Sequence, residues 1–190
     1  SAASEPVLAV QATLLDDALS SLEDGRAGVA DLYFVGVAGD ATEDAFRDDV
    51  EAAQRVMDER WGTAARSVVL LNNPRTLVAA PIATLTNLRD SLDEIGAAMD
   101  PDEDVAMVYV STRGHPDGAL EMRMPPLELV PITPALLRGA FDDAGIRYRI
   151  VVVSACHAGA FVDELADDDA DHRQRRGDAC VARIRVGFMQ

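Results

Sequence analysis

The chain has 190 residues, of which 48% are hydrophobic, and this length and composition allow a single domain with a sizeable core. Its formal net charge of −16 disfavours nucleic acid as a partner, because a phosphate backbone carries charge of the same sign. No run of about 18 apolar residues is present, so we expect no membrane span. The sequence from Ser1 lacks a signal-peptide pattern, but a longer membrane-attached or exported parent is compatible with it, so its native location stays open.

Apolar runs and stretches with helical spacing alternate along the chain. Leu88, Leu92 and Ile95 recur at intervals of four and three residues, as on one face of a helix. Thr133, followed by proline, is typical of a helix start, and Gly145 is typical of a helix end. The predicted elements, in chain order, are a strand over 31–37, a helix over 41–61, a strand over 67–72, a helix over 84–99, a strand over 104–110, a small hairpin over 119–130, a helix over 133–144 and a strand over 148–153.

The four predicted strands are continuously apolar rather than alternating, and this pattern is typical of a parallel sheet covered on both faces. The order of elements therefore predicts an α/β fold, a three-layer α/β/α sandwich with a mainly parallel sheet. Right-handed crossovers then place the carboxyl ends of all four strands at one edge, where ligands and catalytic groups gather. Two segments of unusual chemistry follow strands there, 111–118 and 154–159.

The second of these segments carries a thiol, Cys156, directly after a strand. A thiolate at a sheet edge can attack a carbonyl carbon, assisted by a histidine that takes its proton and by backbone amides that hold the oxyanion. The first segment offers both kinds of helper, since Gly114 allows close backbone approach and His115 is the nearest imidazole by topology. A buried cysteine is otherwise usually a small hydrophobic residue. Cys156 and Cys180 are too few for a disulfide framework or a zinc cluster, and we expect no metal and no cofactor.

Several short motifs, taken in order, resemble the legumain-like family of cysteine peptidases, which belongs to the same clan as the caspases. The likeness is to bacterial members and extends over about residues 6–168. It rests on segments 31–36, 58–64, 71–74, 83–88, 111–118 and 151–159 of the sequence. The resemblance implies a caspase-like fold and hydrolysis of peptide or protein substrates through a thioester intermediate.

The resemblance also assigns residues to roles. In that family a His-Gly pair ends the third strand and an Ala-Cys pair ends the fourth, so Cys156 is the nucleophile, and Gly114 with Cys156 supplies the oxyanion-binding amides. The family's histidine falls on Arg113, which cannot act as a general base near neutral pH. His115, two residues on, can assist only if the loop turns it toward the thiol.

Three functions therefore stay open from the sequence. The first is a cysteine endopeptidase that uses Cys156, Gly114 and His115. The second, favoured by Arg113, is a catalytically impaired relative that acts as a binding or scaffold domain. The third is a redox-responsive thiol protein. The sequence indicates neither the side-chain preference of a substrate pocket nor an oligomeric state.

The other histidines and the acidic cluster receive no role. His157 is interpreted as a solvent-facing turn residue, and the carboxylates of 163–171 as a solvated surface. The resemblance ends near residue 168, and 169–190, which includes His172, reads as a divergent tail. We interpret this tail either as the product of a frameshift, which would leave the sheet incomplete at that edge, or as a chain that forms a short divergent strand over 181–188.

Overall fold

Helices and strands alternate along the chain in the computed structural model, which describes residues 5–165 and 181–185. The elements are α1 (Glu5–Ser20), β1 (Leu32–Ala38), α2 (Asp44–Trp61), β2 (Ser67–Leu71), α3 (Leu85–Ala98), β3 (Val105–Ser111), α4 (Pro134–Asp143), β4 (Arg149–Ser154), α5 (Gly159–Leu165) and β5 (Val181–Arg185).

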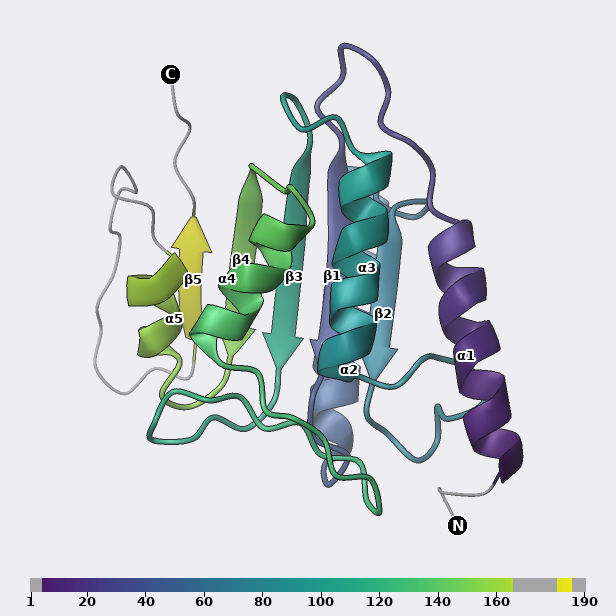
Figure 1. Cartoon of the computed structure of the whole chain (residues 1–190), viewed down its shortest axis with the longest axis vertical. Helices are drawn as coiled ribbons and strands as arrows, with labels where there is room; N and C mark the ends of the chain where they lie inside the picture. Colours follow the sequence, from purple (N-terminus) through teal and green to yellow (C-terminus); the bar gives the residue numbers. More distant parts are fainter. Residues whose placement is uncertain (1–4, 166–180, 186–190) are drawn as a thin grey trace.

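The strands form one sheet in the order β2-β1-β3-β4-β5 (Figure 1). The first four strands are parallel, and β5 pairs with β4 in the antiparallel direction. The register aligns Val68, Val35, Val108 and Val151 in one row across the four parallel strands. All four side chains are buried, as the continuous apolar runs of the sequence predict.

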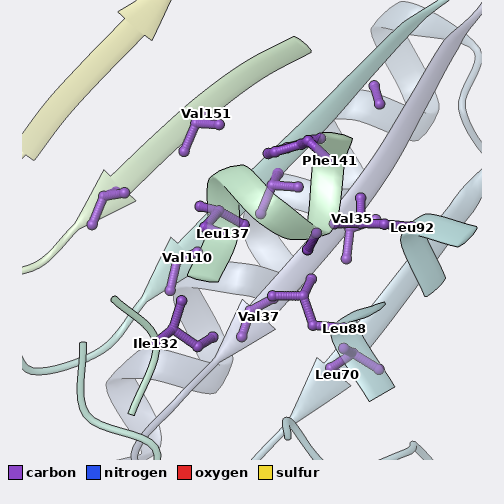
Figure 2. Packing of buried hydrophobic residues seen from close by; sticks show 14 of the residues in the cluster. Val35, Val37, Leu70, Leu88, Leu92, Val110, Ile132, Leu137, Phe141 and Val151 are labelled. Carbon is purple, nitrogen blue, oxygen red and sulfur yellow. The ribbon is translucent and has the colours of Figure 1, made fainter. Parts of the chain in front are cut away.

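Helices cover both faces of the sheet, so the predicted α/β/α sandwich is confirmed. α3 and α4 lie over one face and α2 lies behind the other (Figure 1). Leu88 and Leu92 of α3, with Leu137 and Phe141 of α4, pack on the first face in the main hydrophobic core (Figure 2). Val50 of α2 belongs to a smaller cluster, to which residues of β1 and β2 also contribute. None of the helices within residues 5–165 has both the length and the apolar character needed to cross a bilayer.

The ends of α4 confirm the capping signals of the sequence, and α3 has a cap that the sequence analysis did not name. The hydroxyl of Thr84 accepts a hydrogen bond from the Asn87 amide at 2.9 Å and begins α3. Thr133 caps α4 in the same way through the Leu136 amide, with proline at the first helical position. Gly145, just past α4, has a φ of 68°, which glycine adopts without strain.

Three features differ from the prediction. α1 and α5 were not predicted: α5 has only seven residues, whereas α1 is rich in Val, Leu and Ala and was a signal that the prediction missed. α2 begins at Asp44 rather than at 41, because the Asp40 carboxylate accepts a hydrogen bond from the Thr42 amide at 2.9 Å and forms a turn there. The hairpin over 119–130 consists of isolated backbone pairs, Leu120 with Ile132 and Met124 with Leu127.

The tail is described only over Val181–Arg185, which forms β5 at the edge of the sheet beside β4. This strand agrees with the interpretation of a short divergent strand over its described part, and residues 186–188 of that prediction lie outside the described residues. The predictions made for 166–180, including those for His172 and Cys180, lie outside the described residues.

Candidate active site

The carboxyl ends of β1, β3 and β4 meet at one edge of the sheet (Figure 1, lower ends of these arrows). Backbone hydrogen bonds continue the pairing past the strands. The amide of Gly39 donates to the Ser111 carbonyl at 3.0 Å, and that of Thr112 donates to the Ser154 carbonyl at 3.2 Å. The loops that follow these strands are thus held together by backbone bonds at the edge where the sequence predicts a site.

Gly114 and Cys156 come into direct backbone contact at this edge. A Cβ atom added to Gly114 would lie 1.7 Å from the Cys156 carbonyl oxygen, so only glycine fits there. The Cys156 side chain is exposed. No described residue accepts a hydrogen bond from the Gly114 amide. The structure therefore brings together two of the residues that the sequence predicts for the site.

The ladder between β3 and β4 ends just before the thiol. Ser111 is paired with Ser154, the last pair of the ladder, and Cys156 lies in the turn that follows. Of the 111–118 segment, Gly114 is the residue that contacts the Cys156 backbone. Arg113 and His115 flank this glycine, one on each side.

Arg113 is turned toward the loop after β1 and binds two carboxylates there. Its Nε donates to Asp40 Oδ2 at 2.8 Å, and its Nη2 donates to the Glu43 carboxylate. Its Cζ lies 5.9 Å from the centroid of the Phe46 ring. The hydrogen bond to Asp40 and the charge of Glu43 raise the pKa of Arg113 above its usual value, so this residue stays protonated and cannot accept the thiol proton.

His115 has a carboxylate partner, since its Nε2 is hydrogen bonded to Glu121 Oε2. The two residues face each other across a tight hairpin in which the His115 amide donates to the Ala119 carbonyl at 2.9 Å and Gly114 pairs with Leu120. A carboxylate on one ring nitrogen fixes the orientation of an imidazole. The loop thus provides His115 with an orienting group, Glu121, that the sequence analysis did not identify.

His157, next to the thiol, is exposed and has a φ of 57°. This left-handed backbone is uncommon for a residue with a side chain, and it lets the chain leave β4 sharply before α5 begins at Gly159. The interpretation of His157 as a solvent-facing turn residue agrees with this geometry.

Asp40 is the most important site residue that the sequence analysis missed. Its side chain is fully buried, and it directly follows Gly39 at the end of β1. A charged residue immediately after a buried strand, at the same edge as the thiol, was the available signal. Without the strand order, nothing in the sequence placed that residue beside position 113.

A second polar group lies below the thiol on the α2 face. Ser111 donates a hydrogen bond to Asp49 Oδ2 of α2 at 3.0 Å. Burial raises the pKa of neighbouring Tyr109, as does the nearby charge of Asp49. The hydrogen bond between Ser111 and Asp49 ties α2 to β3. It also makes the α2 face of the sheet polar near its carboxyl edge.

No metal site is found among the described residues, because no three His, Cys, Asp or Glu side chains are placed to hold a metal ion. An open groove of about 450 Å³ lies between α1 and α3, with Leu15 and Leu19 among its lining residues and carboxylates such as Asp16 and Asp93 as its polar groups. We place the candidate site at Cys156, because the strand ends converge there on an exposed thiol and a glycine amide.

Comparison of the chain with protein-family models, with curated proteins and with solved structures finds no match in any of the three. The residues of the chain itself therefore carry the functional proposal.

Proposed function

We propose that the chain is a legumain-like cysteine peptidase domain with a caspase-like fold, in which Cys156 is the nucleophile. The observation that carries this proposal is the backbone contact between Gly114 and Cys156 at the carboxyl edge of a parallel sheet. It supports an arrangement in which an exposed thiol and an unengaged glycine amide face the same substrate carbonyl.

The reaction proceeds in two steps. Cys156 Sγ attacks the carbonyl carbon of a peptide bond, the C–N bond breaks, and the amine leaves with the proton that the thiol gave up. A water molecule then hydrolyses the thioester, which yields the carboxylic acid and restores the thiol. In both steps the Gly114 amide donates to the oxyanion.

Proton transfer is assigned to His115, oriented by Glu121. The imidazole takes the thiol proton and passes it to the leaving amine, and it later activates the water. The Glu121 carboxylate on Nε2 leaves Nδ1 of His115 to carry out the transfer. This step needs the 115–118 loop to bring the imidazole to the thiol, since Gly114 makes the contact with Cys156 and the His115 imidazole is hydrogen bonded to Glu121.

The second candidate is a relative that binds peptides at the same edge without hydrolysing them. The ion pairs of Arg113 with Asp40 and Glu43 favour it, because they fill the position before Gly114 with a group that cannot accept a proton.

Covalent labelling separates the two candidates. A peptide-based electrophile that ends in Asn or Asp is incubated with wild type and with Cys156→Ala, and the labelled residue is identified by mass spectrometry. The peptidase predicts one label, at Cys156. No label at Cys156 with any probe would contradict the role of this thiol as a nucleophile.

The rate at which a peptide substrate is hydrolysed then tests the assignment of His115 as the general base. We expect His115→Ala to abolish hydrolysis and Glu121→Gln to reduce it by about 10-fold, because general acid–base assistance contributes about 100-fold or more. Arg113→His is the informative contrast, since it puts an imidazole beside Asp40, directly before Gly114. Hydrolysis by Arg113→His alone would identify the wild type as the non-hydrolysing relative.

A further inference from the structure

Three side chains from the segment after β1 surround the guanidinium of Arg113. Asp40 accepts from Nε at 2.8 Å, Glu43 accepts from Nη2, and the Phe46 ring centroid lies 5.9 Å from Cζ. Two carboxylates that accept from different guanidinium nitrogens, together with an aromatic ring, are the groups that recognise a guanidinium. We call Asp40, Glu43 and Phe46 the cation cage.

The cage and its occupant differ in burial. The Asp40 side chain is 0% exposed, and its Oδ1 already accepts the Thr42 amide, so Oδ2 is the oxygen that faces the cation. The Arg113 side chain is 52% exposed. A buried carboxylate requires a positive partner, because it has lost the water that would solvate its charge. An arginine that is half exposed can leave an ion pair with little change in free energy, because water solvates its guanidinium. The cage is therefore the fixed part of this contact, and the arginine is the replaceable part.

We propose that the cation cage is a binding site for arginine side chains, filled from within the chain by Arg113, and that a peptide lying over Cys156 places an arginine there when Arg113 moves out. The choice of substrate rests on the proposed function, whereas the binding of a guanidinium to the cage does not. Arg113 then acts as an internal competitor that limits access of arginine-containing peptides to the thiol.

The position of the cage next to Gly114 supports this substrate class. Arg113 directly precedes Gly114, whose backbone contacts that of Cys156, so a side chain that replaces Arg113 binds one residue away from this contact. Two carboxylates and a ring do not form a metal site, and no metal-binding group of three was found among the described residues. A lysine ammonium would satisfy the charge, but as a point charge it lacks the planar fork that meets both carboxylates.

Ligand-induced stabilisation of Arg113→Ala tests the cage without any need for catalysis. Methylguanidinium is added at about ten times its dissociation constant for the variant, and thermal midpoints are compared with those in methylammonium at the same concentration. A ligand that binds only the folded state stabilises it. We expect methylguanidinium to raise the midpoint of Arg113→Ala by about 3 °C and that of wild type by less than about 1 °C.

Two further variants keep this test decisive. Arg113→Gln empties the cage but retains a long polar side chain, and it replaces Arg113→Ala if the latter does not fold. The double variant Asp40→Asn/Arg113→Ala removes the buried charge and should lose the response. Equal shifts in wild type and variant, no shift in either single variant, or an unchanged shift in the double variant would each overturn the cage.

Labelling of Cys156 tests the substrate. Electrophiles that differ only in a terminal Arg or Asn are compared on wild type and on Arg113→Ala, and we expect the Arg/Asn ratio of labelling rates to rise about 10-fold in the variant, which corresponds to one decade in affinity. Stabilisation by methylguanidinium without any label at Cys156 would refute the proposed function and leave the cage intact. If Cys156 is labelled but the Arg/Asn ratio of labelling rates does not rise in Arg113→Ala, the assignment of arginine-containing substrates would be refuted and the proposed function would stand.

Discussion

The two ends of the parallel sheet each hold an arginine that lies over an aromatic ring and faces a buried aspartate. At the amino end, Arg66 lies 5.8 Å from the Tyr33 ring centroid and 3.7 Å from Asp31. At the carboxyl end, Arg113 lies 5.9 Å from the Phe46 centroid and 2.8 Å from Asp40. The two clusters have the same composition.

They differ in what else the arginine touches. Arg66 is 6% exposed and also donates to the Asp24 carbonyl, so it ties the chain before β1 to the start of β2. Arg113 is 52% exposed and is held by carboxylates alone, beside Gly114 and Cys156. The arginine–aspartate pair at the amino end is therefore part of the framework of the fold. At the carboxyl end, the arginine of the pair is replaceable. Burial of the cation, rather than the presence of an ion pair, tells the two apart.

The largest expected effect comes from removing the buried cation. Arg66→Ala leaves Asp31 buried with only the exposed Arg26 as a cationic partner, and we expect it to lower the free energy of unfolding by about 3 kcal/mol, since breaking a buried pair by removing one partner is strongly destabilising. Urea denaturation monitored by far-UV circular dichroism measures this loss. Arg113→Ala is the matched control at the other end and should cost less, because Arg113 is 52% exposed and water that enters the site it leaves can solvate Asp40 Oδ2.

An equal loss of stability in Arg66→Ala and Arg113→Ala would contradict the comparison. It would mean that Asp40 depends on its arginine as strongly as the amino-end cluster depends on Arg66, and that Arg113 is not displaceable.

A pair of glycines sharpens the comparison further. A Cβ at Gly25 would lie 2.3 Å from Asp104 Oδ2 at the amino end, and one at Gly114 would lie 1.7 Å from the Cys156 carbonyl oxygen. We expect both alanine substitutions to destabilise the protein by about 2 kcal/mol, because extra atoms in a tight contact force the backbone to shift. Only Gly114→Ala should also slow the labelling of Cys156, which a rate measurement at a temperature well below both midpoints detects. Unchanged labelling in Gly114→Ala would separate this glycine from the site.

Much of the framework follows from local patterns. The buried row of valines through Val35 and Val108 belongs to apolar runs of the sequence, and Thr84 and Thr133 are of a residue type that caps helices. Both signals depend only on neighbours in the chain. The edge of the sheet that carries Cys156 follows from the handedness of the crossovers.

The contacts around the thiol could not be read in the same way. The pairings of Arg113 with Asp40 and of His115 with Glu121 depend on the strand order and on the path of a loop that has only isolated backbone pairs. The resemblance to the legumain-like family placed Arg113 at that family's histidine position. It did not reveal that a buried carboxylate from the segment after β1 faces Arg113.

The smallest expected effect is the pH dependence that Asp31 contributes at the amino end. The hydrogen bond from Arg26 lowers the pKa of Asp31 below its usual value, and the charge of Arg66 acts in the same direction. A carboxyl group whose pKa is lowered by folding contributes stability that is present above its unfolded pKa of about 3.9 and is lost as the pH falls through the folded value. The difference in unfolding free energy between wild type and Asp31→Asn should therefore stay constant from about pH 7 to pH 5 and shrink below about pH 4. Urea titrations at these pH values measure it, and a difference that stays constant down to about pH 3, below which both proteins acid-denature, would show that the Asp31 charge is not what holds Arg26 and Arg66 in place.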